Sequence, residues 1–239
     1  TLVNSAIQQI AYRNSSDAPP ASVQVDWTFS DGNSGGQGSG GVLTATGSTT
    51  VTITGVNDAP TITNLSGDSL SYSEGAGAVV IDQGNNALVT DIDSANFNTG
   101  TLTVSIPVGG EPTEDVLTIR NQGTGAGQIG VSGFDVSYEG MTIGTFTGGA
   151  GGTDLVVTLN GNATATAVTA LVKNITYEDI NADSPTEGGF TIRFVLTDGD
   201  GGTSGNYDVS ALVAGVNDAP TDLTLSANTV AENAANGTV

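Results

Sequence analysis

The sequence contains no cysteine and no histidine, and only four of its 239 residues are lysine or arginine. Without cysteine, the chain has no disulfide, no thiolate ligand for zinc and no cysteine nucleophile. Without histidine, it lacks an imidazole general base and the most common ligand of zinc and iron. Together these two absences exclude most hydrolase mechanisms.

The few basic residues are outnumbered by 25 acidic ones, which gives a formal net charge of −21. Nucleic-acid binding depends on lysine and arginine to neutralise phosphates, so we expect no nucleic-acid partner. An anionic membrane surface is disfavoured for the same reason. A charge this negative needs counterions, and clustered carboxylates favour hard cations such as Ca²⁺.

No run of 18 apolar residues occurs, so we expect no membrane span. The opening TLVNSAIQQI lacks the basic start and the cleavage site of a signal peptide, so we expect any export signal to lie elsewhere in a longer parent protein. Glycine is abundant, with 35 residues, and long charged helix formers are scarce. This composition predicts an all-β protein with many turns.

Internal repeats are the most informative feature of the sequence. Residues 3–12 match residues 168–177 at an offset of 165, and VQVDWTFSDG at 23–32 matches FTIRFVLTDG at 190–199 at an offset of 167. In the first pair, apolar residues spaced i, i+3, i+4, i+7 predict a short helix, followed by a strand that begins at the shared tyrosine. In the second pair, apolar residues alternate as in a strand with one buried face, so we expect Trp27 in a core rather than on a sugar-binding surface.

The repeat divides the chain into consecutive parts, which we interpret as a window on a longer tandem array. They are the back part of one domain (1–56), a linker (57–60), a complete domain (61–216), a second linker (217–220) and the first strand of a third domain (221–239). A half domain alone would expose unpaired strand edges, which soluble proteins avoid. Seven or more short strands in the roughly 155 residues of the complete domain predict a β-sandwich with one helix.

The hexapeptide GVNDAP occurs at both linkers, in copies 160 residues apart. Its proline fixes its own φ, favours an extended preceding residue and lacks an N–H, so it can end one sheet without pairing into the next. Asn57-Asp58 and Asn217-Asp218 present oxygen atoms at the two seams. Taken alone, the motif is explained equally well as a turn and linker or as part of a metal site.

Three further acidic features favour the metal site. Asp91-Ile92-Asp93 places alternate carboxylates in a predicted loop, where both can close on one cation. Glu74 lies on the opening strand of the complete domain, and Glu232 holds the same place in the next one. The third feature is the Tyr-Glu-Asp segment that contains Glu178, followed later by Asp198.

Taken in order, these motifs resemble those of the cadherin fold, and more closely the cadherin-like repeats of giant bacterial surface adhesins. The cadherin pattern is an early Glu, a D-x-D, an L-D-R-E, an A-x-D and a closing D-x-N-D-N-x-P. The corresponding segments here are Glu74, Asp91-Ile92-Asp93, Ile175-Thr176-Tyr177-Glu178, Thr197-Asp198 and Gly215 to Pro220. The resemblance covers the whole complete domain (61–216) and implies tandem cadherin-like β-sandwich domains. The internal repeat further predicts one short helix in each domain.

The resemblance also implies that each calcium ion is held by two neighbouring domains and their linker. At the first junction the implied ligands are Asn57, Asp58, Asp91, Asp93 and Asp198. At the second junction they are Glu74, Glu178, Asn217 and Asp218, and Glu232 is the third-domain counterpart of Glu74.

Several departures from the family pattern remove ligands. Glycine replaces the first Asp of the linker motif, alanine replaces its second Asn, and Arg13 stands where Glu178 stands in the next repeat. We therefore expect one or two calcium ions per junction, a dissociation constant of roughly 10⁻⁴ to 10⁻³ M, and a poorer first junction.

The resemblance, together with the internal repeat, implies a non-catalytic segment of a long secreted bacterial cell-surface protein, a calcium-stiffened spacer or adhesin array whose partners are the neighbouring repeats. One alternative is a module that binds glycan or protein through the glycine-rich loops at 121–130 and 147–153. Another is a subunit that self-associates laterally in an extracellular filament or sheath. Adjacent carboxylates such as Glu114-Asp115 point to opposite faces of a strand, so we expect no glycosidase.

Overall fold

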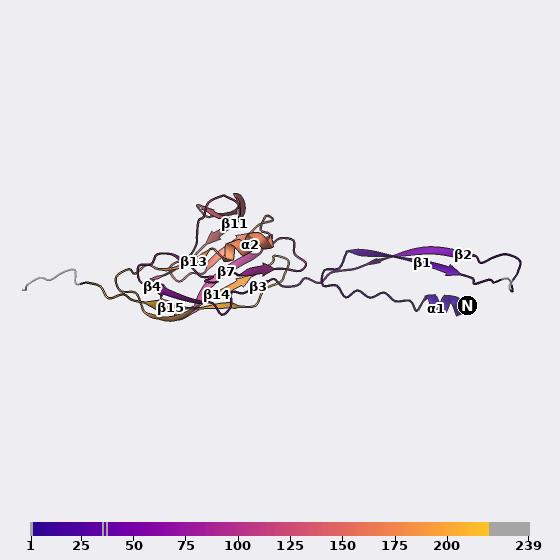
Figure 1. The fold of residues 1–239 in the computed structure, drawn as a ribbon, viewed down its shortest axis with the longest axis horizontal. Helices are drawn as coiled ribbons and strands as arrows, with labels where there is room; N and C mark the ends of the chain where they lie inside the picture. The colour runs from indigo at the N-terminus through magenta and orange to yellow at the C-terminus, as the bar shows by residue number, and fades with distance from the viewer. Residues whose placement is uncertain (1, 35, 37, 220–239) are drawn as a thin grey trace, which may run out of the picture.

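The computed structural model describes residues 2–34, 36 and 38–219, and this part of the chain is mostly β-structure. Figure 1 shows an elongated molecule in which a two-stranded hairpin lies beyond one end of a larger body. The predicted all-β class is confirmed in this coarse form, because sheets dominate and only two short helices occur in the described residues. Neither helix is long and apolar enough to cross a membrane.

The hairpin belongs to the first part of the chain. Strand β1 (Ser22–Ser30) pairs antiparallel with β2 (Thr44–Thr52), and the short helix α1 (Leu2–Ile7) precedes them. None of the described residues before Pro60 is buried. This part of the chain therefore has no core of its own.

The body consists of one large sheet and two small ones. The large sheet has the strand order β4 (Ser69–Ser73), β15 (Tyr207–Ala214), β14 (Gly188–Leu196), β7 (Thr101–Val108), β12 (Leu155–Leu159), β11 (Met141–Thr147), β10 (Asp135–Tyr138) and β9 (Ile129–Ser132). The small sheets are β5 (Val79–Val80), β13 (Ile175–Asp179) and β8 (Asp115–Ile119), and β3 (Thr61–Thr63) with β6 (Leu88–Thr90). The arrangement is sandwich-like, with one core among the sheets.

The core contains the alternate residues that the sequence pattern predicts. Ile192, Phe194 and Leu196 on β14 are fully buried, whereas the residues between them are only partly buried. Tyr72 and Tyr177 pack edge to face, with ring centroids 5.1 Å apart. These side chains come from strands that are far apart in the sequence, so the core forms only when the whole body folds.

Helix α2 (Ala165–Val172) lies inside the segment where the sequence predicts a helix. The side chain of Thr164 caps its start by accepting a hydrogen bond from the backbone N–H of Ala167 at 3.3 Å. Val168 and Leu171 on its apolar face are fully buried. The predicted helix in this part of the chain is thus confirmed, while one helix in every repeat stays a prediction.

The two linkers lie at opposite ends of the body. Strand β15 leads directly into the second linker, whereas Asn57 of the first linker contacts Asp198 in the loop that precedes β15. The entry and exit points are therefore separated by the length of β15 (Figure 1). A domain that is entered at one end and left at the other suits an end-to-end array.

Two expectations for the first part of the chain are wrong in this structure. No strand begins at Tyr12, although its counterpart Tyr177 lies on β13 between β5 and β8. Trp27 is not in a core, because 43% of it is exposed. Both differences have the same physical cause. In the body, the strands that pair with the equivalent residues and cover them come from residues 61–165. Among the described residues of the first part, no strands correspond to these.

Candidate metal centres

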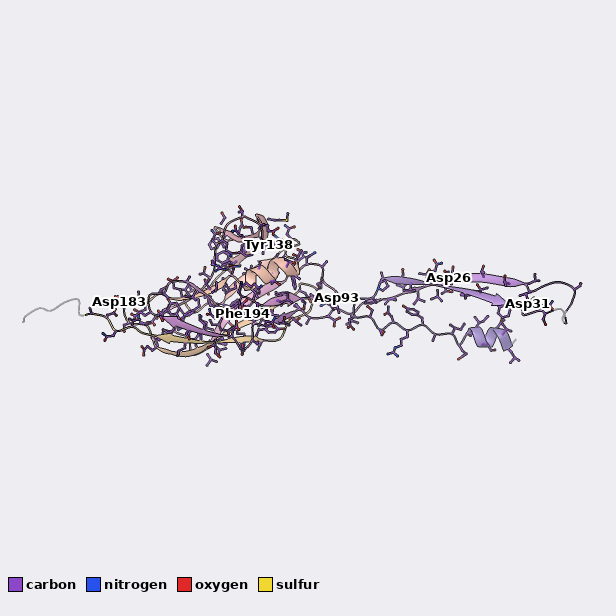
Figure 2. The ribbon with its side chains drawn as sticks, in the orientation of Figure 1. Asp26, Asp31, Asp93, Tyr138, Asp183 and Phe194 are labelled. Carbon is purple, nitrogen blue, oxygen red and sulfur yellow. The ribbon has the colours of Figure 1, made fainter. Side chains whose placement is uncertain are left out.

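The first junction is built from the linker and two loops of the body. The backbone N–H of Asp58 donates to Oδ2 of Asp93 at 3.2 Å, and the side-chain amide of Asn57 donates to Oδ2 of Asp198 at 2.8 Å. Asp93 follows β6 and Asp198 follows β14, so strands from different sheets end at this linker. Figure 2 shows Asp93 at the end of the body that faces the hairpin. Asp91 also accepts a hydrogen bond from the backbone N–H of Asp93, so all five predicted residues are linked by hydrogen bonds at this junction.

Asp198 is fully buried and organises the loop that follows it. Its Oδ1 accepts hydrogen bonds from the backbone N–H groups of Asp200, Gly201 and Gly202 at 2.8, 3.0 and 2.9 Å. Burial acts to raise the pKa of Asp198, but these bonds and the one from Asn57 outweigh burial and lower the pKa. Because its oxygens are already occupied, Asp198 is less available to a cation than the other predicted ligands.

The linker approaches this loop so closely that only glycine fits at position 202. A Cβ there would lie 2.8 Å from the carbonyl oxygen of Asp58 and 2.9 Å from Cα of Ala59, and it would overlap Oδ2 of Asp198. The linker backbone therefore packs directly on the loop, which holds the linker against this end of the body.

Asp91 has one oxygen with partners and one without. Its Oδ1 accepts hydrogen bonds from the backbone N–H groups of Asp93 at 3.2 Å and Ser94 at 3.0 Å. Its Oδ2 is buried and has no hydrogen-bond partner in the described part of the chain. Burial raises the pKa of Asp91, and the charge of Asp93 adds to this effect. A buried carboxylate oxygen without a partner is costly, so this atom is the one that a cation would satisfy best.

An open pocket of about 470 Å³ at this junction is lined by Asp17, Asp58 and Asp91. Asp17 comes from the first part of the chain and is missing from the predicted ligand set. A signal for it exists in the sequence, because Asp17-Ala18-Pro19 matches Asp183-Ser184-Pro185 at an offset of 166, between the offsets of the two longer matches. The preceding part of the chain therefore contributes a carboxylate to the first junction.

The second junction is built from two glutamates that hold Gly215 and Val216, the two residues directly before the second linker. Oε2 of Glu74 accepts a hydrogen bond from the backbone N–H of Val216 at 2.6 Å, and Oε1 of Glu187 accepts one from Gly215 at 2.8 Å. A Cβ at Gly215 would lie 2.6 Å from Oε1 of Glu187. The glycine that departs from the expected linker motif thus has a structural reason, since it allows this close approach.

Glu74 repeats the arrangement seen at Asp91. Its Oε1 is buried and has no hydrogen-bond partner within the described residues. An open pocket of about 650 Å³ beside Glu74 is also lined by Asp183, Glu187 and Asn217. Figure 2 shows Asp183 at the end of the body opposite Asp93. Burial raises the pKa of the neighbouring Asp179, and the charges of nearby carboxylates, Glu74 among them, raise it further. Negative charge therefore gathers at this end as well.

The remaining predicted ligands are placed differently. Glu178 lies on β13 opposite Val116 of β8 and is not among the residues that line this pocket, where Glu187 is found instead. Asp218 is exposed and does not line the pocket either. Glu232, with the strand predicted in 221–239, lies outside the described residues.

The donor atoms at both ends suit calcium, which binds carboxylate, amide and backbone carbonyl oxygens. Each end has one buried, unpartnered carboxylate oxygen, Oδ2 of Asp91 or Oε1 of Glu74. Across the described residues, however, no three acidic side chains are grouped closely enough to form a metal site. Exposed members such as Asp58 and Asn217 would have to move towards the buried oxygens to complete one.

The glycine-rich segments that could serve as binding loops are tied to the body. In 121–130, the side chain of Asn121 donates to the backbone C=O of Val131 on β9 at 3.0 Å and accepts from its N–H at 3.2 Å. In 147–153, the C=O of Gly149 accepts from the N–H of Leu117 at 2.7 Å. Both segments cover strand edges, which protects a sheet from pairing with other chains.

The adjacent carboxylates Glu114 and Asp115 also have structural partners. The hydroxyl of Tyr177 donates to Oδ1 of Asp115 at 2.5 Å. The oxygens of Glu114 accept from the side chain of Asn181 at 2.8 Å and from the backbone N–H of Thr186 at 2.7 Å. Both carboxylates therefore hold neighbouring segments together.

Comparison with known protein families and with curated protein sequences gives no match for this chain. The internal repeat and the two junctions are therefore the features of the molecule that bear on its function.

Proposed function

We propose that this chain is a non-catalytic segment of a long bacterial surface protein, in which calcium joins cadherin-like domains into a stiff array. The observation that carries the proposal is the buried, unpartnered carboxylate oxygen at each junction, on Asp91 and on Glu74. Each lies where a copy of the GVNDAP linker meets the body, and the two sites are at opposite ends.

Calcium would stiffen the array because one ion would be held by groups of the body and of the linker together. Asp91 and Glu74 each have a buried oxygen in the body, whereas Asp58 and Asn217 of the linkers are exposed. An ion bound by both sets would fix the angle between neighbouring domains. Without the ion, like charges at the junction repel one another, and this repulsion works against the contacts that hold the linker on the body.

The proposed location is outside the cell, on the bacterial surface. Weak sites with dissociation constants of roughly 10⁻⁴ to 10⁻³ M are typical of extracellular calcium-binding modules. A stiff spacer of this kind would hold a distal binding module away from the cell. The proposed partners are the neighbouring repeats and a glycan or protein target recognised elsewhere in the protein.

The proposal is tested by titrating the full 239-residue chain with calcium while measuring the melting temperature and small-angle X-ray scattering. At about 10 mM calcium and the expected affinity, binding should add about 1.4 to 2.7 kcal/mol to the stability of the body. For a domain of this size, that corresponds to a rise of about 3 to 10 °C in the melting temperature. The scattering should also show a longer, less variable particle.

Two variants each remove one negative charge. Asp91→Asn should abolish calcium binding at the first junction, and Glu74→Gln should abolish calcium binding at the second. Without calcium, both variants should be at least as stable as the parent, because each removes the negative charge of a carboxylate that has one buried oxygen without a partner and keeps the oxygen that accepts hydrogen bonds. Loss of binding is thereby separated from loss of folding. Asp135→Asn, which removes the same charge from an exposed position on β10, is the matched control. If calcium changes neither melting temperature nor scattering, GVNDAP is only a linker and the proposal fails.

A further inference from the structure

The first part of the chain presents an exposed apolar face. A groove of about 360 Å³ runs between the α1 segment and the hairpin, and its lining includes Ile7, Tyr12, Trp27 and Phe29. These residues are between 41% and 43% exposed. The ring of Trp27 lies against Gly47 on β2, where a Cβ would overlap it, so the hairpin already presents the ring in a defined position.

The internal repeat shows what covers this face in a complete domain. Trp27 and Phe29 match Phe194 and Leu196, and Tyr12 matches Tyr177. All three counterparts are 0% exposed in the body. The same positions are therefore buried in one copy of the repeat and open in the other.

The strand edges show the same contrast. In the body, β14 pairs with β15 on one side and with β7 on the other, where Phe194 lies opposite Val104. Within the described residues, β1 pairs only with β2, so the edge that corresponds to the β7 side of β14 has no neighbouring strand. Likewise, β13 lies between β5 and β8, whereas residues 10–13 form no strand.

We propose that this face is a docking site for the front part of a domain of the same kind, a β-rich polypeptide segment equivalent to residues 61–165. A strand like β7 would pair with the open edge of β1, as in strand addition, and its apolar side chains would cover Trp27 and Phe29. Strands like β5 and β8 would then enclose residues 10–13 and convert them into a strand. One occupant thus satisfies both the apolar face and the open hydrogen-bonding edge, which a small ligand would not do.

Trp27 is the only tryptophan in the chain, so its fluorescence reports on this face alone. The test joins a second copy of residues 61–165 directly to the N-terminus of the full chain. The expected result is a shift of the emission to shorter wavelength and a severalfold fall in quenching by acrylamide. Slowed hydrogen exchange at the backbone amides of 10–13 and of β1 should accompany it.

The matched control carries Leu102→Asp and Val104→Asp in the added copy only. Both side chains lie on β7 and are fully buried in the core of the body, so the charged replacements should prevent the added β7 from covering Trp27. Trp27 should remain quenchable in this control, while the unchanged middle domain of the same molecule reports on folding. The proposal is wrong if Trp27 is as accessible in the extended chain as in the original one. It is also wrong if the original chain protects Trp27 as a dimer that loses the protection on dilution, because the occupant would then be a second copy. The readout needs no calcium, so its failure and that of the proposed function are distinguishable.

Discussion

At the second junction, Glu187 and Glu178 differ in what their positions allow. Glu187 precedes β14, accepts a hydrogen bond from Gly215 and lines the pocket that contains Glu74. Glu178 lies on β13 outside that pocket, although the sequence pattern points to it. The two residues have the same charge, so they form a matched pair.

We expect Glu187→Gln to weaken calcium binding at the second junction by about tenfold, or about 1.4 kcal/mol, because it removes a charged ligand beside Glu74. Glu178→Gln should leave the affinity nearly unchanged. Isothermal titration calorimetry of the two variants in parallel measures this difference. The reverse order of effects would show that the sequence pattern, rather than the described geometry, identifies the ligand.

The carboxyl group of Asp115 should make its own contribution to the pH dependence of the free energy of unfolding. Burial raises its pKa and the charges of Glu111 and Glu114 add to this effect, although hydrogen bonds from the Tyr177 hydroxyl and the Glu111 N–H act in the opposite direction. A carboxyl with a higher pKa in the folded state binds its proton more tightly there than in the unfolded chain. Its contribution to stability therefore rises as the pH falls from neutral through the folded pKa.

We expect the parent to gain stability relative to Asp115→Asn as the pH is lowered from about 7 towards about 4, because the variant has no proton to take up. Urea unfolding of both proteins across this range measures the difference. Asp135→Asn, on an exposed strand, is the control for the general effect of removing one negative charge. A difference between parent and Asp115→Asn that does not change with pH would contradict the assignment.

At the scale of elements, the first linker and the loop between β14 and β15 form one packed unit. Asp198 ties the loop together through backbone N–H groups, and Asn57 and Asp58 pack against it. The position of the linker therefore depends on the close approach at Gly202, whereas Gly205 in the same loop has open space around it.

We expect Gly202→Ala to destabilise the body by about 1 to 3 kcal/mol, because the added methyl group overlaps Asp198 and the backbone of Asp58. Gly205→Ala should change the stability little. Chemical unfolding of the two variants tests this, and the response of Gly202→Ala to calcium should be weaker at the first junction. Equal stabilities for the two variants would show that the linker does not need this contact.

At the scale of the whole molecule, charge works against compactness. A net charge of −21 with four basic residues destabilises the folded chain through self-repulsion, and dissolved salt screens this repulsion. Calcium can therefore act in two ways, by screening and by binding. The elongated arrangement adds a second consequence, since a bound ion at either end would change the shape of the particle as well as its stability.

We expect sodium chloride to raise the melting temperature gradually, whereas calcium at constant ionic strength should raise it at millimolar concentration and then saturate. Magnesium should be much less effective, because it requires a smaller octahedral site and keeps most of its water. Differential scanning calorimetry in matched buffers separates the two effects. Equal responses to calcium and magnesium would mean that the ions only screen charge.

Several features of this protein could be predicted from the sequence because they depend on local properties of the chain. Alternating apolar residues predicted the buried face of β14, and helical spacing predicted α2. Composition alone predicted a protein made mostly of strands, as the structure has it. Asp58 of the first GVNDAP copy and Asp93 of the Asp91–Asp93 pair are in contact, as the resemblance to cadherin motifs implied, and their role as calcium ligands stays a prediction.

Other features were decided only by the tertiary structure, because they depend on which strand ends coincide in space. The presence of Glu187 rather than Glu178 beside Glu74 follows from the parallel pairing of β4 with β15 and the antiparallel pairing of β14, which place three strand ends together. Asp198 is occupied by backbone donors, and Asp91 is left with an unpartnered oxygen, for reasons of loop packing that no spacing reveals. Trp27 is exposed because burial of its strand requires residues from another segment, and the same alternating pattern is therefore a core in one copy and an open face in the other.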